Sequence, residues 1–313
     1  MNNIYLTKTK NFAFEKHKGD LPFEVDSNLV DNWVSEYNLK TNQTKDFTAE
    51  INNQRYRVHL FHSHRGWNAA LRLLPSKILS FEELGIDQEE LLSICKSTGL
   101  VLFCGPTGSG KSTTMNCVID SLLASKELGV TITIEDPIEY LHLKDEIFQR
   151  EVNTDVNSFK DGMIEAVRAS PTTIVIGEIR DSATALEAVR AGLNGHRVFA
   201  TLHASNVKEA ISRLWAFLDD QGDELLVQAL QGIVAQYLVN ITDSQKYCLC
   251  ETLLIDNQTK NILYQVLKGS ATLDQINHCF NAQERETVPD KVRELKDTQP
   301  ALDLSLFNFV KNW

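Results

Sequence analysis

The strongest chemical signal in the chain is a run of glycines that ends in lysine and serine. It reads Gly105-Pro106-Thr107-Gly108-Ser109-Gly110-Lys111-Ser112, continues into Thr113, and fits the pattern G-x-x-x-x-G-K-[ST]. The glycines let backbone N–H groups turn toward phosphate oxygens. Lys111 adds a positive charge at the β- and γ-phosphates, and the Ser112 hydroxyl can bind Mg²⁺. The segment from Gly105 to Thr113 is therefore a predicted nucleotide-binding loop.

Two acidic segments follow this loop along the chain. Glu135-Asp136-Pro137-Ile138-Glu139 comes directly after one apolar stretch, and Glu178 ends the stretch Ile174-Val175-Ile176-Gly177. A hydrolase needs carboxylates to orient a water molecule and to hold a metal ion. Taken alone, either segment could be a set of ordinary surface carboxylates. Their order after the loop favours hydrolysis over simple phosphate binding.

These residues require strands and helices to position them. The apolar run 100–103 precedes the glycines, and a helical pattern follows them to about residue 124. Short β-branched runs at 131–134, 174–176 and 198–201 alternate with helical patterns at 158–169 and 182–193. Strands alternating with helices predict a parallel sheet covered by helices on both faces, with ligands at the carboxyl ends of the strands.

The remaining segments suggest further domains. Short alternating runs between residues 47 and 74 predict strands of a small N-terminal α/β domain over residues 1–75, followed by a linker and helix at 76–98. The main domain is expected over 99–280, with residues 206–239 helical. The polar stretch after residue 280 predicts a linker, and an apolar tail ends the segment 281–313.

Composition limits the classes of partner and compartment. The chain has 313 residues, 42% hydrophobic residues and a formal net charge of −11, which disfavours direct nucleic-acid binding. The first 20 residues have no apolar core of a signal peptide, and no run of about 18 apolar residues occurs, so we expect a cytoplasmic location. Six cysteines include one C-x-C pair but no zinc motif, and we expect buried, reduced thiols.

Four segments together resemble a known family. The glycine-rich loop, Ile134–Tyr140, Ile176–Asp181 and Gly195–His203 are similar to the Walker A, Asp box, Walker B and His box of the type II/type IV secretion ATPases. The N-terminal runs that begin at Arg55, Arg65 and Leu74 resemble motifs of that family's PAS-like domain. The resemblance covers about residues 50–240 and implies a RecA-like P-loop ATPase core behind a smaller PAS-like α/β domain.

The resemblance also implies roles for single residues. Glu139 corresponds to the general base, Glu178 to the Walker B acid that acts on Mg²⁺ through water, and His203 to the sensor of the γ-phosphate, with His196 as its companion. Four arginines match basic positions of the family, two in the N-terminal domain and two between the acidic boxes: Arg57, Arg72, Arg150 and Arg168. Each of these arginines could instead be solvated or lie in a structural ion pair.

The sequence departs from the family at three points. Ser170-Pro171-Thr172 stands where Asp-Pro-Asp is usual, the four-cysteine zinc element is absent, and no Ala-Ile-Arg-Asn-Leu-Ile signature occurs. The absence of the zinc element and the short N-terminal region favour the compact branch, which contains pilus-retraction motors and motors of type IVB secretion and conjugation. The missing signature argues against a retraction motor.

The resemblance implies an Mg²⁺-dependent ATPase that assembles as a hexamer and acts on an inner-membrane platform protein, to which it binds peripherally. Two alternatives stay open at this point: a nucleic-acid translocase or helicase on the same core, and a scaffold that binds ATP without turnover.

Overall fold

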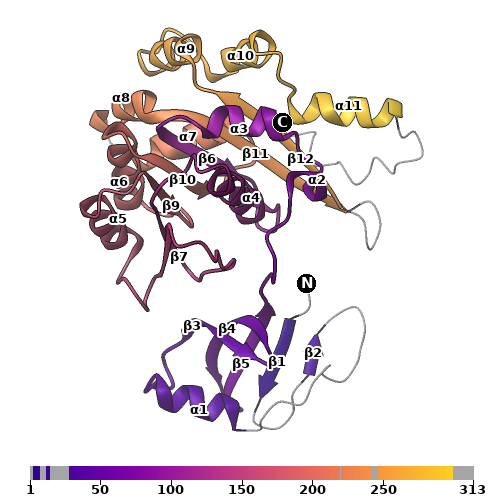
Figure 1. Ribbon diagram of the computed structural model, residues 1–313, viewed down its shortest axis with the longest axis vertical. Coiled ribbons are helices and arrows are strands. Elements are labelled where there is room, and N and C mark those ends of the chain that lie inside the picture. The colour runs from indigo at the N-terminus through magenta and orange to yellow at the C-terminus, as the bar shows by residue number, and fades with distance from the viewer. Residues whose placement is uncertain (1–2, 8–11, 15–27, 219, 241–245, 299–313) are drawn as a thin grey trace. The chain divides into compact units, whose positions relative to one another are not determined.

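The computed structural model describes residues 3–7, 12–14, 28–218, 220–240 and 246–298 (Figure 1). The contacts of these residues divide the chain into two units. One contains the described residues up to Lys77 together with the short segment Pro137–Leu141, and the other contains Ile78–Asp136 and the described residues from His142 onward. No helix of the described residues is both long enough and apolar enough to cross a membrane.

The N-terminal unit is a small antiparallel sheet with one helix. Its described strands lie in the order β2-β1-β5-β4-β3, and every neighbouring pair is antiparallel. Val30 and Trp33 of the helix pack on Val58, Leu60 and other apolar residues of one sheet face. The elements are β1 Asn3–Thr7, β2 Phe12–Phe14, α1 Leu29–Glu36, β3 Lys45–Ile51, β4 Gln54–Ser63 and β5 Gly66–Leu73.

The larger unit is built on a mostly parallel sheet. Its strands are β6 Gly99–Cys104, β7 Thr131–Glu135, β8 Ile147–Glu151, β9 Thr173–Ile176, β10 Arg197–Leu202, β11 Leu230–Asn240 and β12 Lys246–Leu254. They lie in the order β12-β11-β6-β10-β9-β7-β8. Each neighbouring pair is parallel except β11 and β12, which are antiparallel. The sheet is therefore mixed only at its β12 edge.

Helices cover both faces of this sheet (Figure 1). Alternate residues of β6 point to opposite faces: Leu100 and Leu102 join one core, and Val101 and Phe103 join the other. The first core contains residues of α5 to α10, whereas the second contains residues of α2 to α4. The helices are α2 Phe81–Leu84, α3 Gln88–Cys95, α4 Lys111–Ala124, α5 Phe159–Arg168, α6 Ser182–Leu193, α7 Val207–Phe217, α8 Asp220–Ala229, α9 Asn257–Leu267, the 3-10 helix η1 Leu273–Ile276, α10 Asn277–Ala282 and α11 Val288–Thr298.

The predicted fold class is confirmed, and one prediction of secondary structure is wrong. The expected helix over 206–239 ends at Ala229, and β11 begins at the next residue. This strand is buried on both faces, with Ile233 in one core and Val234 in the other. A strand covered on both faces has no polar alternation, so its apolar run cannot be distinguished from a buried helix by periodicity.

The region after residue 280, expected as a polar linker, contains helix α11, whose Val288 and Val292 are buried. The apolar tail expected beyond it lies outside the described residues.

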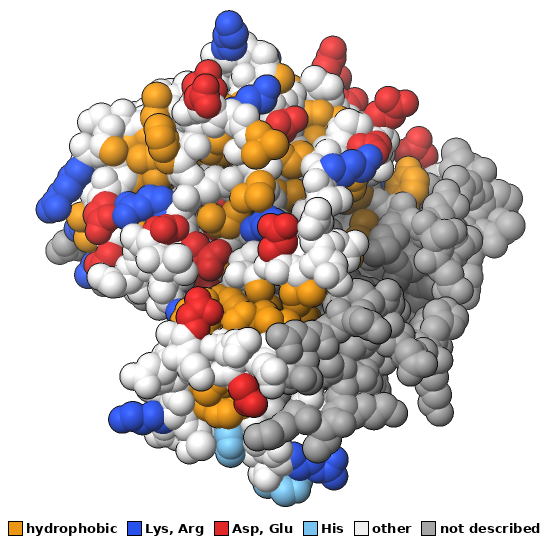
Figure 2. Space-filling view, turned by 60° about the horizontal axis from the view of Figure 1, so that its bottom comes forward, with side chains coloured by type: hydrophobic (Ala, Val, Ile, Leu, Met, Phe, Trp, Pro, Cys, Tyr) orange, Lys and Arg blue, Asp and Glu red, His pale blue; other side chains and the backbone are white. Residues whose placement is uncertain are grey.

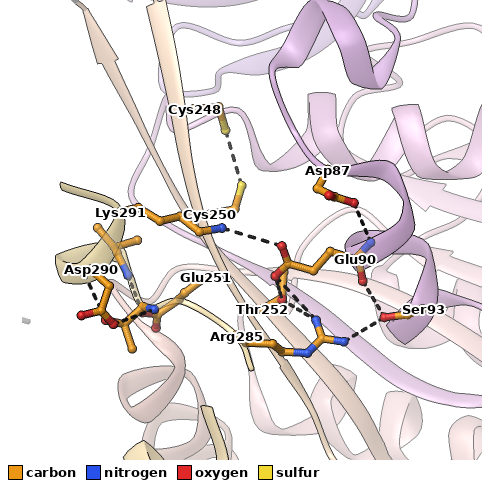
Figure 3. A network of polar contacts seen from close by, with 12 residues as sticks. Asp87, Glu90, Ser93, Cys248, Cys250, Glu251, Thr252, Arg285, Asp290 and Lys291 are labelled. Carbon is orange, nitrogen blue, oxygen red and sulfur yellow. Dashed lines mark hydrogen bonds and ion pairs between the residues drawn. The ribbon is translucent and has the colours of Figure 1, made fainter. Parts of the chain in front are cut away.

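Two polar clusters attach this C-terminal region to β12 (Figure 3). In the first, Arg285 Nη2 donates to Ser93 Oγ at 2.8 Å and Nη1 donates to Thr252 Oγ1 at 2.5 Å. In the second, the buried Glu251 accepts the backbone N–H of Val207 at 3.0 Å and that of Val288 at 3.3 Å. Burial raises the pKa of Glu251 to about 7, although both amides act in the opposite direction. Glu251 thus joins the first residues of α7 and α11.

Charged side chains of both signs are dispersed over the face of the molecule in Figure 2. Among the residues coloured there, Asp and Glu lie between Lys and Arg, with hydrophobic side chains among them. The residues coloured in that view therefore form no continuous basic tract of the kind that follows a nucleic-acid backbone.

Candidate nucleotide-binding site

The glycine-rich loop connects the carboxyl end of β6 to the start of α4. Gly110 precedes the helix with a φ of 89°, a left-handed conformation that favours glycine, and it offers no side chain to cap the helix. The N–H groups at the start of α4 can therefore serve an anion. Lys111 is buried, and its Nζ donates to the carbonyls of Gly105 at 2.9 Å and Pro106 at 3.0 Å. The predicted nucleotide loop thus forms as a strand–loop–helix unit.

A carboxylate and a histidine follow two neighbouring strands at the same edge of the sheet. Glu178 comes two residues after β9, and His203 comes directly after β10. Their side chains meet, with His203 Nε2 at 3.1 Å from Glu178 Oε1. The other carboxylate oxygen accepts Arg180 Nε at 2.8 Å, and Arg180 Nη1 donates to Asp136 Oδ2 at 3.2 Å. Glu178 is therefore held between a histidine and an arginine.

The lysine of the loop acts electrostatically on this histidine. Burial lowers the pKa of His203, and the positive charge of Lys111 lowers it further, whereas Glu178 opposes both effects. Its surroundings therefore favour the neutral imidazole. The structure thus brings together the loop lysine, Glu178 and His203, three residues that the sequence predicted at one site.

Glu135 and Glu139, two of the three acids in the segment 135–139, have different surroundings. Glu135 is buried and accepts hydrogen bonds from Thr133 Oγ1 at 2.7 Å and Gln149 Nε2 at 3.0 Å, which makes it structural. Glu139 lies in the segment Pro137–Leu141, which belongs to the N-terminal unit. There Arg55 donates to the carbonyls of Ile138 at 2.7 Å and Glu139 at 3.3 Å. Arg55 begins one of the motifs that resemble the family's N-terminal domain, but no local pattern in the sequence indicates these bonds.

Arg57 and Arg72 lie opposite each other on β4 and β5 of the same unit. Arg57 Nη2 is 3.7 Å from Asp46 Oδ1. Like charges directly opposite on neighbouring strands destabilise a sheet. An anion between them would offset that repulsion, so the pair fits a phosphate-binding role, while the contact with Asp46 fits a structural one.

The two arginines predicted between the acidic boxes lie on peripheral elements. Arg150 is on β8, four strands from β6 in the sheet order, or about 19 Å at roughly 4.8 Å per strand. It donates to Glu165 Oε2 at 2.7 Å. Arg168 is the last residue of α5, where a cation complements the helix dipole. The structure gives both positions a structural explanation, and their predicted role at a nucleotide stays a prediction.

The structure corrects the predicted place of His196 beside His203. It precedes β10, whereas His203 follows it, so the two histidines are roughly 20 Å apart along the strand. The Nδ1 of His196 lies 2.7 Å from the carbonyl oxygen of Pro171. Only the carboxyl ends of parallel strands share an edge with the loop, and His196 is at the other end.

Asn116 and His142 form a hydrogen-bonded pair beside the loop that no sequence motif indicates. Asn116 of α4 donates from Nδ2 to the carbonyl of Ser112 at 2.8 Å, and its Oδ1 lies 2.6 Å from His142 Nε2. Because that oxygen is an acceptor, His142 donates through Nε2. His142 directly follows the segment 137–141 and lies outside every motif, so only the fold reveals the contact.

Comparisons of the sequence with known proteins give one consistent result. The family described as "Type II/IV secretion system protein" matches residues 33–293. The type IV pilus retraction ATPase PilT of Pseudomonas aeruginosa is 31% identical over 274 residues, which cover 78% of this chain and 79% of that protein. A twitching motility protein of Neisseria gonorrhoeae is 33% identical, over 76% of this chain and 66% of that protein.

Solved structures with the same fold include two ATPases. The pilus retraction motor PilT with bound ADP has a TM-score of 0.72 and 30% identity, covering 92% of this chain and 91% of that one. The ATPase DotB of Legionella pneumophila has a TM-score of 0.81 at 24% identity, covering 99% of this chain and 91% of that one. The second likeness is one of fold alone.

The charges around His203 make a testable prediction. Lys111→Ala should raise the pKa of His203 because a positive neighbour is removed, whereas Glu178→Gln should lower it. The ring-proton NMR signals of His203, followed against pH in the full chain, measure both shifts. Lys96, which pairs with Glu127, provides the control: Lys96→Ala should leave the titration of His203 in place. An unchanged pKa of His203 in Lys111→Ala would refute the electrostatic effect assigned to Lys111.

Proposed function

The chain belongs to the type II/IV secretion system protein family, and we propose that it is an ATP-hydrolysing motor of a pilus or secretion machine. The observation that carries this proposal is the meeting of Glu178 with His203 under the charge of Lys111, at the edge where the loop follows β6. A loop that only bound phosphate would not need this pair. The relative PilT, which binds ADP in a solved structure, supports adenine nucleotide as the ligand.

Each residue has a distinct part in the proposed reaction. The loop amides and Lys111 bind the phosphates, and Glu139 accepts a proton from the attacking water. His203 holds Glu178 through the 3.1 Å contact and faces the γ-phosphate. The Ser112 hydroxyl and the Glu178 carboxylate are oxygen donors that suit Mg²⁺, and Glu178, with both oxygens engaged, would hold it through water. When bound, Mg²⁺ would neutralise charge on the phosphates.

We further infer that the chain works as a ring of copies, a hexamer, on the cytoplasmic side of the inner membrane. Glu139, Arg57 and Arg72 belong to a different unit from the loop, so the proposed roles draw on residues of both units. A partner in the membrane, the platform protein of the machine, would take up the movement that hydrolysis drives. The formal net charge of −11 supports a protein partner over nucleic acid.

Binding and hydrolysis can be separated by two substitutions. Lys111→Ala should abolish nucleotide binding, because Lys111 contacts phosphates before any reaction. Glu178→Gln should bind ATP normally and lower kcat on the order of 100-fold or more, because Glu178 acts mainly in the transition state. Titration calorimetry and phosphate release measure the two effects. Glu187→Gln, which alters an ion-pair carboxylate on α6, is the control and should keep both properties. Hydrolysis at the parent rate by Glu178→Gln would overturn the role given to that residue.

Assembly is tested by dilution. If a site is complete only in a ring, the specific ATPase activity should fall as the full chain is diluted, in step with the loss of oligomer in sedimentation. A monomer with full specific activity would exclude the ring.

The arginines of β4 and β5 are tested by comparing rate with stability. Arg57→Ala and Arg72→Ala should each lower kcat by up to about 10³-fold and leave ADP affinity nearly unchanged, since the neutralised charge develops on the transferred phosphoryl group. Asp46→Ala is the matched control, because it removes the ion-pair partner of Arg57 and keeps the arginine. If Arg57→Ala and Asp46→Ala both melt earlier and both retain kcat, Arg57 is structural.

A further inference from the structure

A buried glutamine of β11 lies against the nucleotide loop. Gln236 is fully buried, and it directly follows Ala235, which pairs with Cys104 at the end of β6. Its Nε2 donates to the backbone carbonyl of Ser109, inside the loop, at 2.7 Å. The same nitrogen lies 3.7 Å from Cys248 Sγ on β12, and Cys248 in turn contacts Cys250 at 3.6 Å (Figure 3).

These contacts assign the orientation of the side-chain amide. With Nε2 toward Ser109, one hydrogen serves the carbonyl and the other serves the sulfur. With the amide reversed, two acceptor oxygens would face each other. The Gln236 side chain is therefore a donor to the loop.

Two glycines of the loop lie very close to Gln236. A Cβ on Gly105 would lie 2.4 Å from the Gln236 carbonyl oxygen, and one on Gly110 would lie 3.1 Å from Gln236 Nε2. The first distance is too short for any side chain, and the second requires a neighbour to move. Both glycines thus allow a close approach to Gln236, and Gly105 also allows one to Ser109, whose Oγ would lie 2.3 Å from the added Cβ.

Gln236 also leaves an acceptor without a partner. Its Oε1 is buried and has no hydrogen-bond partner among the residues that the structure describes, and the same holds for Ser109 Oγ. A buried acceptor without a partner destabilises a fold, whereas an apolar side chain of the same size would avoid this cost. Stability alone therefore does not explain a glutamine at this position, and its donor must serve another purpose.

We propose that Gln236 is a positioning residue for nucleotide binding, acting through the peptide group between Ser109 and Gly110. In a trans peptide the C=O and the following N–H point in opposite directions. Holding the Ser109 carbonyl toward Gln236 therefore directs the Gly110 N–H away from the sheet, to the side where the loop amides meet phosphate. The inference rests on the proposed function for the identity of the ligand.

The experiment compares nucleotide affinity with melting temperature in the same preparations of the full chain. Gln236→Met keeps the volume, leaves the Ser109 carbonyl without its donor and removes the unpaired Oε1, two changes that offset each other in stability. The Kd for ATP should therefore rise tenfold or more while the Tm stays within a few degrees of the parent. Gln236→Glu should weaken binding further, because a carboxylate oxygen would face the Ser109 carbonyl. Titration calorimetry gives Kd, and differential scanning fluorimetry gives Tm.

Gln283 offers a matched control at the other end of β12. Its side chain donates to the Leu254 carbonyl at 2.8 Å and accepts the Leu254 N–H at 3.1 Å. Gln283→Met should therefore lower Tm and leave Kd unchanged, which is the pattern of a purely structural glutamine.

The outcomes separate this inference from the proposed function. If Lys111→Ala abolishes binding but Gln236→Met binds ATP as the parent does, the role of Gln236 is overturned and the function stands. If Lys111→Ala binds ATP normally, the proposed function fails. Should Gln236→Met not fold, Gln236→Asn, whose shorter side chain cannot reach Ser109, is measured against the same two outcomes.

Discussion

The site depends on the parallel pairing of β10 between β6 and β9. The register places Leu202 beside Cys104 and Ala200 beside Ile176, so all three strands end at one edge of the sheet. The loop, Glu178 and His203 each follow one of these ends, and no long-range movement is needed to bring them together. Because every residue of β6 and β10 is buried, the helices on both faces fix this register, and through it the site.

The residues proposed for chemistry are divided between two units of the chain. Lys111, Glu178 and His203 belong to the larger unit, whereas Glu139 is attached by Arg55 to the unit that holds Arg57 and Arg72. Ground-state binding can therefore be complete in one unit, while proton transfer and neutralisation of the γ-phosphate depend on the other. Under the proposed roles, the groups for binding and the groups for proton transfer therefore belong to separate units of the chain.

Structural features that a short stretch of sequence encodes can be predicted, whereas contacts between residues far apart in the sequence cannot. The strand before the loop, the helix after it and the acid after β9 each lie within a few residues of their motif, and these predictions hold. β11 was expected as helix because burial on both faces removes its alternation. The family resemblance pairs His196 with His203, although a strand separates them. Gln236 has no local signal at all, because its contact with Ser109 joins residues 127 positions apart.

The Glu251 carboxyl group connects the helix that follows His203 to the last described helix through two hydrogen bonds. Val207, whose N–H it accepts, follows His203 by three intervening residues, and Val288, whose N–H it also accepts, begins the last described helix. A shift of the His203 backbone that displaced α7 would either carry α11 along or leave a buried oxygen without its partner, at a cost of about 1–3 kcal/mol. Glu251 therefore holds the start of α11 against the start of α7, the helix that follows His203.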